Sequence, residues 1–313
     1  MKGLTIVSTG YYVPSKRVMN DEFTKFLDTS DEWITSRTGI HARYFSEGED
    51  TTDLAYQAAI KALEGYDPQD IGVIIVASIT NTYLTPSTAC LLQKRLGLAE
   101  DVFAFDVNAA CSGFEYALSV ARAQLAFSAK PYALVIGAET LSSIIDFKDR
   151  STCVLFGDGA GAVLVKSSDS LYFDMQGAIG NDEALFCKRQ DGYLTMQGRE
   201  VFRFATGAIE KCIRTILERA QLAVNDVDYY VLHQANGRII SHVYKKLKAD
   251  PAKFYINLNE YGNTSGASVP LALAEMNEKG LLHPGMKIML VGFGGGLTYG
   301  ANLLEWQEES LCG

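Results

Sequence analysis

The feature that most constrains the fold of this chain is an order of elements that occurs twice. Each half contains an apolar strand, then a junction of small residues, then a second strand: 73–77, 109–113 and 131–138 in the first half, and 229–232, 263–267 and 285–292 in the second. The members of these pairs begin 156, 154 and 154 residues apart, close to half of the 313-residue chain. Elements that recur at a near-constant offset indicate duplication of one βα unit. We therefore expect two similar halves, 1–168 and 169–313, divided at a polar, turn-like segment.

The pattern of apolar residues predicts the elements within each half. Short apolar runs rich in β-branched residues predict buried strands at 73–77, 103–107, 133–136, 162–165, 229–232, 254–257 and 288–291. Longer stretches with helical spacing lie at 52–63, 87–96, 114–127, 208–220, 238–247 and 269–278. Strands that alternate with helices favour an α/β fold with largely parallel sheets and helices on their faces.

Composition excludes several classes of protein. The net charge of −9 argues against nucleic acid as the main partner, because phosphate binding requires a strongly basic face. No apolar run reaches the roughly 18 residues of a membrane span, and residues 1–10 lack the pattern of a secretory signal. We therefore expect a cytoplasmic protein without a membrane partner.

The six cysteines are scattered, with no C-x-x-C pair and no histidine at the spacing of metal ligands. We expect no metal site, and in a long chain without a signal peptide we expect no disulfides. The default for each cysteine is a small, buried apolar residue. A functional cysteine must therefore be distinguished by its neighbours in the sequence.

Cys111 is distinguished by its position between a strand and a helix. The apolar run 103–107 ends shortly before it, and a helical pattern begins just after it. At a helix N-terminus the dipole and the unpaired N–H groups favour the thiolate, which is the nucleophilic form. The small residues Ala109, Ala110 and Gly113 leave open space around the sulfur. The pattern predicts a nucleophile, although a buried cysteine that only fills the junction would look the same.

His233 and Asn263 lie at two further strand ends. His233 follows the strand 229–232, at the edge of the sheet where α/β proteins bind ligands, and a neutral imidazole there can donate to or accept from a reacting oxygen. Asn263 occupies the junction that the half-length offset makes equivalent to that of Cys111. Duplication would bring the two junctions towards one centre, so that all three side chains share a cavity. Taken singly, each has an ordinary interpretation: a histidine bonded to backbone carbonyls, and an asparagine in a turn.

Two glycine-rich stretches complete the candidate features. The stretch 293–297 follows the last long strand and allows backbone N–H groups to approach a ligand, as in an oxyanion hole. The stretch 156–161 lacks the spacing of a phosphate-binding loop, and we interpret it as a tight turn between strands.

Together these segments resemble the β-ketoacyl-acyl-carrier-protein synthase III family, the initiating condensing enzymes of bacterial fatty-acid synthesis. The matching segments occur in family order and span nearly the whole chain: 31–43 (DEWITSRTGIHAR), 108–113 (NAACSG), 156–161, 233–236 (HQAN), 262–270 (GNTSGASVP) and 293–296 (FGGG). The resemblance implies an α/β thiolase-like fold, with two similar βα halves related by a pseudo-twofold duplication and layered α-β-α-β-α.

The resemblance also implies a reaction. An acyl-CoA primer would condense with malonyl-acyl carrier protein, releasing CoA and carbon dioxide, with no metal or redox cofactor. Cys111 would carry the acyl group, while His233 and Asn263 would hydrogen-bond the developing enolate oxygen of the malonyl thioester. The backbone N–H groups of Cys111 and Gly294 would form the oxyanion hole.

Further sites follow from the resemblance alone. Contacts to CoA would come from Thr29, Trp33, Arg37, Arg150 and Asn236. The acyl pocket would be formed by Thr85, Leu141, Phe156 and Phe293. An acidic carrier protein would dock on Arg203, Arg238 and Lys245. A homodimer is implied as well.

One position departs from the family pattern. Family members often carry a bulky apolar residue at the position of Thr85, which reaches across the dimer to close the acyl pocket. A threonine there would leave a deeper pocket, so we hypothesise that primers longer than acetyl are accepted.

Other functions remain open on the sequence. A related synthase of secondary metabolism would use the same three side chains with another primer. Cysteine, histidine and asparagine also form a hydrolase set, and a non-catalytic carrier-binding protein is a further alternative. A biosynthetic thiolase is disfavoured, because it uses a second cysteine near the last glycine-rich loop; the stretch 293–300 has none, and Cys312 lies in the terminal tail.

Overall fold

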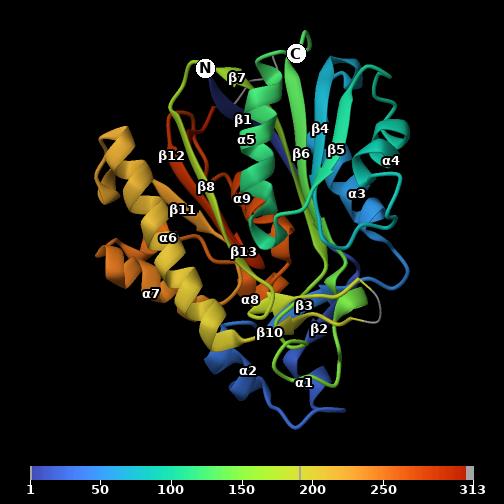
Figure 1. Ribbon diagram of the computed structural model, residues 1–313, viewed down its shortest axis with the longest axis vertical. Helices are drawn as coiled ribbons and strands as arrows, with labels where there is room; N and C mark the ends of the chain where they lie inside the picture. The colour runs from blue at the N-terminus through green and yellow to red at the C-terminus, as the bar shows by residue number, and fades with distance from the viewer. Residues whose placement is uncertain (1, 190–191, 308–313) are drawn as a thin grey trace.

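Two mixed β-sheets stand side by side at the centre of the computed structural model, which describes residues 2–189 and 192–307 (Figure 1). The strand order is β1-β7-β6-β4-β5 in the N-terminal sheet and β11-β12-β13-β8 in the C-terminal sheet. The first sheet contains β1 (Gly3–Tyr12), β4 (Ile71–Ala77), β5 (Phe103–Val107), β6 (Tyr132–Glu139) and β7 (Gly159–Ser168). The second contains β8 (Tyr172–Asn181), β11 (Tyr229–Leu232), β12 (Lys287–Gly294) and β13 (Gly296–Glu305).

The two sheets share one topology, as expected of a duplicated unit. In the N-terminal sheet β4 pairs parallel with β6, and the pairs β6–β7 and β7–β1 are antiparallel. In the C-terminal sheet β11 pairs parallel with β12, and the pairs β12–β13 and β13–β8 are antiparallel. The order β1-β7-β6-β4 therefore corresponds to β8-β13-β12-β11. β5 is an additional edge strand, parallel to β4. The predicted relation of two similar βα halves is confirmed.

The expectation of largely parallel sheets is wrong. Two pairings in each sheet are antiparallel, and β12 reverses directly into β13 across the single residue Gly295. Buried strands of either direction show the same continuous apolar run. Strand direction was therefore not visible in the apolar pattern.

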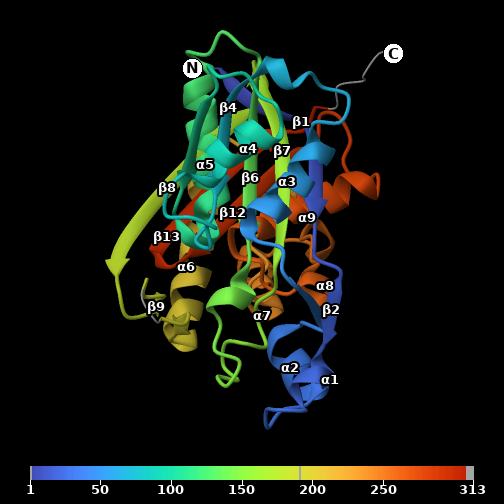
Figure 2. The same cartoon turned by 90° about the vertical axis from the view of Figure 1, so that its right-hand side faces the viewer.

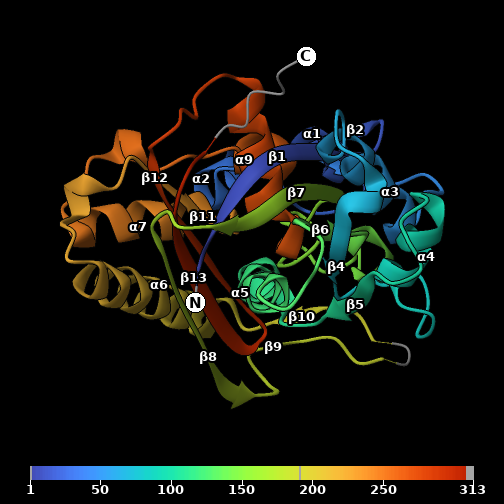
Figure 3. The ribbon, with the colours of Figure 1, turned by 90° about the horizontal axis from the view of Figure 1, so that it is seen from above.

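Helices and sheets form five layers (Figure 3). α5 (Gly113–Leu125) and α9 (Ser268–Glu278) lie between the sheets. α3 (Thr51–Ala62) and α4 (Thr88–Arg95) cover the outer face of the N-terminal sheet, and α6 (Gly198–Ala220) and α7 (Gly237–Leu247) cover that of the C-terminal sheet. The central position explains why α9 buries every residue from Ser268 to Met276, since apolar strands meet both of its faces. This is the α-β-α-β-α order of the thiolase-like fold.

A smaller region lies beyond one end of both sheets (Figure 2). It contains the antiparallel pair β2 (Lys16–Met19) and β3 (Ala42–Phe45), with α1 (Asn20–Phe23), α2 (Asp31–Thr38) and α8 (Leu258–Tyr261) around it. The fully buried Arg43 fixes this region by donating to Asn20 Oδ1 at 2.8 Å and to the carbonyl oxygen of Val154 at 2.6 Å. Two short strands, β9 (Leu185–Phe186) and β10 (Thr195–Met196), pair on the other side of the cavity described below.

Most predicted elements are confirmed, and except at α6 the differences at their ends are small. α6 starts at Gly198, ten residues before its predicted start. The predicted strand 254–257 is wrong, because the turn Pro251–Lys253 and the start of α8 leave Phe254 only a single bridge to Tyr230. The tight turn predicted at 156–161 is also wrong, since Phe156 bridges to Asn263 and β7 begins at Gly159. β1, β8 and β13 were not predicted.

Among the helices of the described chain, none combines the length and the apolar character that a membrane crossing requires.

Candidate active site

A cavity of about 1330 Å³ lies at the carboxyl ends of the parallel strands, between the two halves. Residues that follow β4, β5, β6, β11 and β12 line it: Ile79, Cys111, Leu141, His233 and Gly295. Asn263 reaches the same cavity from the junction that leads into α9. The structure thus brings the three predicted side chains, Cys111, His233 and Asn263, to one place.

Cys111 lies in the short 3-10 turn Ala110–Ser112, which leads from β5 into α5. Ala110 has a φ of 47°, in the left-handed region that few residues other than glycine adopt. Cys111 is 8% exposed, and burial raises the pKa of its thiol to about 12. The expectation of a thiolate in the resting site is therefore wrong, because the loss of solvation outweighs the effect of the helix terminus.

The junction at Asn263 repeats this local geometry. A 3-10 turn, Ser265–Ala267, leads into α9, and Ser265 has a φ of 50°. Asn263 Oδ1 accepts the backbone N–H of Ser265 at 2.8 Å, and its backbone bonds to Leu155 and Gly157, both at 2.9 Å. With the side-chain oxygen used as an acceptor, Asn263 can offer its Nδ2 group as a donor.

His233 is held directly after β11. Its backbone N–H donates to the carbonyl of Val291 at 2.8 Å, and its Nδ1 lies 2.7 Å from Ser268 Oγ. Its ring packs in a T-shaped arrangement with that of Phe293, with the two ring centroids 5.0 Å apart. Burial lowers the pKa of His233 to about 3, so the imidazole is neutral at physiological pH. Ser268 Oγ also accepts the backbone N–H of Gln234 at 3.3 Å.

Gly294 brings the last glycine-rich stretch against the cysteine. A Cβ added at Gly294 would lie 2.6 Å from the backbone nitrogen of Cys111 and 3.0 Å from its Cβ. Only glycine allows the end of β12 to approach the turn at Cys111 this closely.

The predicted CoA contacts gather beside this cavity. The guanidinium groups of Arg37 and Arg150 lie 4.8 Å and 4.5 Å from the ring of Trp33. Asn236 lines the cavity and donates to the carbonyl of Arg37 at 3.1 Å. Thr29 lies just before α2, and its hydroxyl is buried without a partner among the described residues.

The predicted acyl-pocket residues are placed differently from one another. Leu141, Phe156 and Phe293 line the cavity, whereas Thr85 does not. The neighbours Tyr83 and Leu84 line it instead, on an exposed loop.

The predicted docking cations lie on the exposed faces of two neighbouring helices. Arg203 is on α6, and Arg238 and Lys245 are on α7. Within the described ranges, none of the three forms an ion pair with a carboxylate.

Two buried carboxyl groups near Cys111 were not predicted. Glu139 accepts from Thr80 Oγ1 at 2.6 Å and from the N–H of Ile79 at 3.1 Å, and burial raises its pKa to about 7. Glu115, one turn after Cys111, is fully buried, and both of its oxygens lack partners among the described residues. The sequence signal for the burial of Glu115 was its place between the apolar residues of the helical pattern at 114–127.

The remaining cysteines follow the expected pattern only in part. Cys153 and Cys212 are buried, but Cys90 and Cys187 are exposed. Cys312 lies outside the described residues. Within residues 2–189 and 192–307, no group of three or more histidine, cysteine, aspartate or glutamate side chains could hold a metal ion.

Comparison with known proteins places this geometry in a family. Residues 105–178 match the family model described as 3-oxoacyl-[acyl-carrier-protein] synthase III, and residues 217–306 match the model of its C-terminal part. The β-ketoacyl-[acyl-carrier-protein] synthase III of Clostridium tetani is 45% identical, over 97% of this chain and 99% of that protein.

Solved structures agree. The crystal structure of 3-oxoacyl-[acyl-carrier-protein] synthase III from Aquifex aeolicus has a TM-score of 0.93 and 44% identity, over 97% of this chain and all of that one. The priming β-ketosynthase of the R1128 polyketide biosynthetic pathway has the same TM-score at 34% identity, over 98% of this chain and 97% of that one. This chain belongs to the β-ketoacyl-acyl-carrier-protein synthase III family.

Proposed function

We propose that this chain catalyses the decarboxylative Claisen condensation of an acyl-CoA primer with malonyl-acyl carrier protein, and so initiates fatty-acid synthesis in the cytoplasm. The observation that carries the proposal is that Cys111, His233 and Asn263 line one cavity, with the glycine-rich end of β12 against Cys111. Family membership supports the same reaction. A role in secondary metabolism is not favoured, because the synthase of a polyketide pathway is 34% identical to this chain, against 45% for the Clostridium tetani synthase III.

In the first half-reaction, the sulfur of Cys111 attacks the thioester carbon of acyl-CoA. A carbon–sulfur bond to Cys111 forms and the bond to CoA breaks; the proton of the Cys111 thiol leaves on the CoA sulfur. The backbone of Gly294 lies against that of Cys111, and the N–H groups of these two residues would serve one oxyanion. Since burial keeps the thiol protonated at rest, proton loss must accompany the attack.

In the second half-reaction, the malonyl thioester loses carbon dioxide and the resulting carbanion attacks the acyl-Cys111 thioester. Cys111 leaves as a thiolate and takes up a proton, and the β-ketoacyl-carrier product is formed. His233 and Asn263 Nδ2 would donate to the enolate oxygen. Each preorganised donor of this kind is worth about 3–4 kcal/mol of the activation barrier.

The tautomer of His233 suits this role. Ser268 Oγ accepts the N–H of Gln234, so its own proton can be directed to Nδ1 of His233. The single proton of the neutral imidazole then resides on Nε2, where it can be donated. We infer this tautomer from the hydrogen-bond network. Loss of carbon dioxide drives the carbon–carbon bond formation, so the proposed reaction requires no metal or redox cofactor.

The CoA nucleotide would bind beside α2. Trp33 and the guanidinium groups of Arg37 and Arg150 already form a stack. An adenine ring would take the place of the Arg150 guanidinium on the face of Trp33, with Arg150 moving outward to cover the adenine. Thr29 precedes α2, which carries Trp33 and Arg37, and Asn236 donates to the carbonyl of Arg37 at 3.1 Å. These two residues complete the proposed nucleotide site.

The acyl carrier protein would dock on Arg203, Arg238 and Lys245. The chain carries a net charge of −9, so an acidic carrier can be attracted only to a local positive surface. These exposed cations on α6 and α7 lie on the helices that flank His233 and the cavity.

We also propose that each chain divides into two halves at 168/169, between β7 and β8.

We further propose that the active form is a homodimer joined at the β5 edge. Phe103 on β5 is 51% exposed and Leu84 is 77% exposed, beside an unpaired strand edge. An exposed edge strand with apolar side chains favours pairing with another chain. Because Tyr83 and Leu84 line the cavity near this edge, a partner would complete the acyl pocket together with Leu141, Phe156 and Phe293.

Intact-mass analysis tests the function directly. After incubation with a panel of acyl-CoAs, the mass of the protein should increase by one acyl group, and Cys111→Ser should abolish the increase. Addition of malonyl-carrier protein should then release carbon dioxide and the β-ketoacyl product. Release of free fatty acid alone would identify a hydrolase, and unmodified protein would identify a binding protein.

A further inference from the structure

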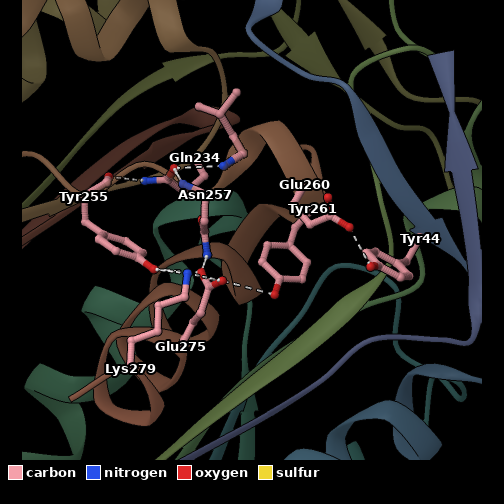
Figure 4. A network of polar contacts seen from close by, with 9 residues as sticks. Tyr44, Gln234, Tyr255, Asn257, Glu260, Tyr261, Glu275 and Lys279 are labelled. Carbon is pink, nitrogen blue, oxygen red and sulfur yellow. Dashed lines mark hydrogen bonds and ion pairs between the residues drawn. The ribbon is translucent and has the colours of Figure 1, made fainter. Parts of the chain in front are cut away.

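A polar network, buried except at Lys279 and in part at Tyr255, connects α9 to the two loops that carry His233 and Asn263 (Figure 4). We call it the α9 network; its members are Gln234, Tyr255, Asn257, Tyr261, Glu275 and Lys279. None of them is among the reacting groups of the proposed mechanism. The network begins next to His233 and ends two residues before Asn263.

Gln234 joins the His233 loop to the segment that leads to Asn263. Its side-chain nitrogen donates to the carbonyls of Leu232 at 2.7 Å and Tyr255 at 3.2 Å. Its side-chain oxygen accepts the backbone N–H groups of Asn257 at 3.1 Å and Leu258 at 3.3 Å. Gln234 is 1% exposed and its amide uses both donors and both acceptor positions, so the two loops cannot shift independently without breaking a buried bond.

Glu275 fixes the other side of that segment. One oxygen accepts from Asn257 Nδ2 at 2.8 Å and from the Tyr255 hydroxyl at 2.9 Å. The second accepts from Lys279 Nζ at 2.7 Å and from the Tyr261 hydroxyl at 3.3 Å. A single carboxylate on α9 therefore bonds to the beginning, the middle and the end of the segment 255–261.

The same helix also holds His233. Ser268, which contacts Nδ1 of His233, lies seven residues before Glu275, two turns along α9 and on the same face. Because α9 is packed between both sheets, it is a rigid base for both contacts. Helix α9 therefore fixes both the position of His233 and the position of the segment that leads to Asn263.

We propose that Glu275 is a positioning residue which, through Asn257 and Gln234, fixes the distance between His233 and Asn263 needed for decarboxylation. The inference rests on the proposed function, because it assigns these two donors to the second half-reaction. Cys111 belongs to another loop, and no hydrogen bond joins it to a member of the network. Its thiol faces Ser265, beyond the segment that Glu275 holds, so we expect acylation of Cys111 to depend much less on Glu275 than condensation does.

Glu260 provides a matched control. It belongs to the same segment, accepts from the Tyr44 hydroxyl at 2.7 Å and pairs with Arg17 at 2.5 Å. Figure 4 shows its carboxylate directed towards Tyr44 and away from Glu275. Glu260→Gln removes a carboxylate with a tyrosine and a cationic partner, as Glu275→Gln does, but it leaves Gln234 and Asn257 untouched.

The test measures the two half-reactions separately in Glu275→Gln and Glu260→Gln. The rate of Cys111 acylation is followed by quenched intact-mass analysis, and single-turnover condensation is followed on enzyme acylated beforehand. For Glu275→Gln we expect acylation within about twofold of the parent and condensation lower by about 10- to 100-fold, the effect of a misplacement of about 1 Å. Glu260→Gln should change neither rate by more than about twofold.

A double-variant comparison separates positioning from a general loss of structure. In a His233→Ala background, Glu275→Gln should cost much less than in the parent, because one of the positioned donors is already absent. Three results would overturn the proposal. The first is an equal loss of rate in acylation and in condensation, and the second is an additive loss of condensation rate in the double variant. The third is a Glu275→Gln enzyme whose two rates match those of Glu260→Gln.

If Glu275→Gln does not fold, Asn257→Ala replaces it, since it breaks the connection and leaves Glu275 with three donors; a condensation rate equal to the parent's would then overturn the proposal. A parent enzyme that never acylates Cys111 would instead refute the proposed function itself.

Discussion

The buried carboxyl of Glu115 allows a quantitative test of the packing around α5. Glu115 lies in the first turn of this helix, fully buried, and neither oxygen has a partner among the described residues. A Cβ added at Gly292 on β12 would lie 2.1 Å from one of these oxygens, which shows how tightly the carboxyl is enclosed. Burial raises the pKa of Glu115 well above its ordinary value of 4.5, so the folded protein holds this carboxyl neutral.

The sign and size of the effect follow from proton linkage. Above pH 4.5 the unfolded chain releases the proton that the folded protein keeps, so the contribution of Glu115 to stability falls as pH rises. Each pH unit between the ordinary pKa of 4.5 and the raised pKa of the folded protein costs about 1.4 kcal/mol. Glu115→Gln keeps the shape and abolishes the titration, so its free energy of unfolding relative to the parent should increase as pH rises from 5.5 to 7.5, by at most about 2.7 kcal/mol.

Urea denaturation of both proteins at the two pH values, at equal protein concentration, measures this difference. Glu218→Gln, a substitution of an exposed carboxylate on α6, is the control for the loss of one carboxylate from the chain. If the parent and Glu115→Gln curves shift in parallel between the two pH values, the Glu115 carboxyl ionises normally in the folded protein and the argument is refuted.

Further predictions address the proposed roles one by one. Ser268→Ala removes the hydroxyl at 2.7 Å from Nδ1 of His233, and single-turnover condensation should fall about tenfold or more while Cys111 acylation is unchanged; an unchanged condensation rate would contradict the assigned tautomer. Trp33→Ala removes the aromatic face on which the adenine ring would stack and should raise the KM for acyl-CoA about fivefold or more, since stacking of a base on an aromatic ring is worth about 1–3 kcal/mol. Steady-state kinetics with an unchanged KM would remove Trp33 from the nucleotide site. Arg238→Glu should raise the KM for the carrier protein relative to the parent at low salt, and less so at high salt. A KM equal to that of the parent at both salt concentrations would place docking elsewhere. With Thr85 in place of a bulkier residue, octanoyl-CoA should acylate the enzyme alongside acetyl-CoA and isobutyryl-CoA, and a strict preference for acetyl-CoA in the mass assay would refute the deeper pocket.

Much of the candidate site could be predicted because its signals are local. Cys111 and His233 each follow a recognisable strand, and the half-length offset makes the junctions of Cys111 and Asn263 equivalent in the sequence, as they are in the shared cavity. The structure repeats even the left-handed residue of each junction, Ala110 and Ser265. Periodicity and duplication are properties of neighbouring residues and of the whole chain, and both are visible in one sequence.

Charge states were not predictable in the same way. The helix terminus at Cys111 suggested a thiolate, but the pKa of a thiol depends on how much water its surroundings exclude. Burial also determines that His233 is neutral and that Glu115 holds its proton. These properties arise from layers of the fold that are distant in sequence.

The sequence by itself determined the duplicated α/β plan, the positions of most helices and central strands, and the three side chains of the candidate site, because apolar spacing and strand ends are encoded locally. Only the tertiary structure decided the directions of the strands, the protonation of Cys111 and the network that ties Glu275 to Gln234. Those features depend on which distant segments meet and on how completely they exclude water, and no spacing along the chain specifies either.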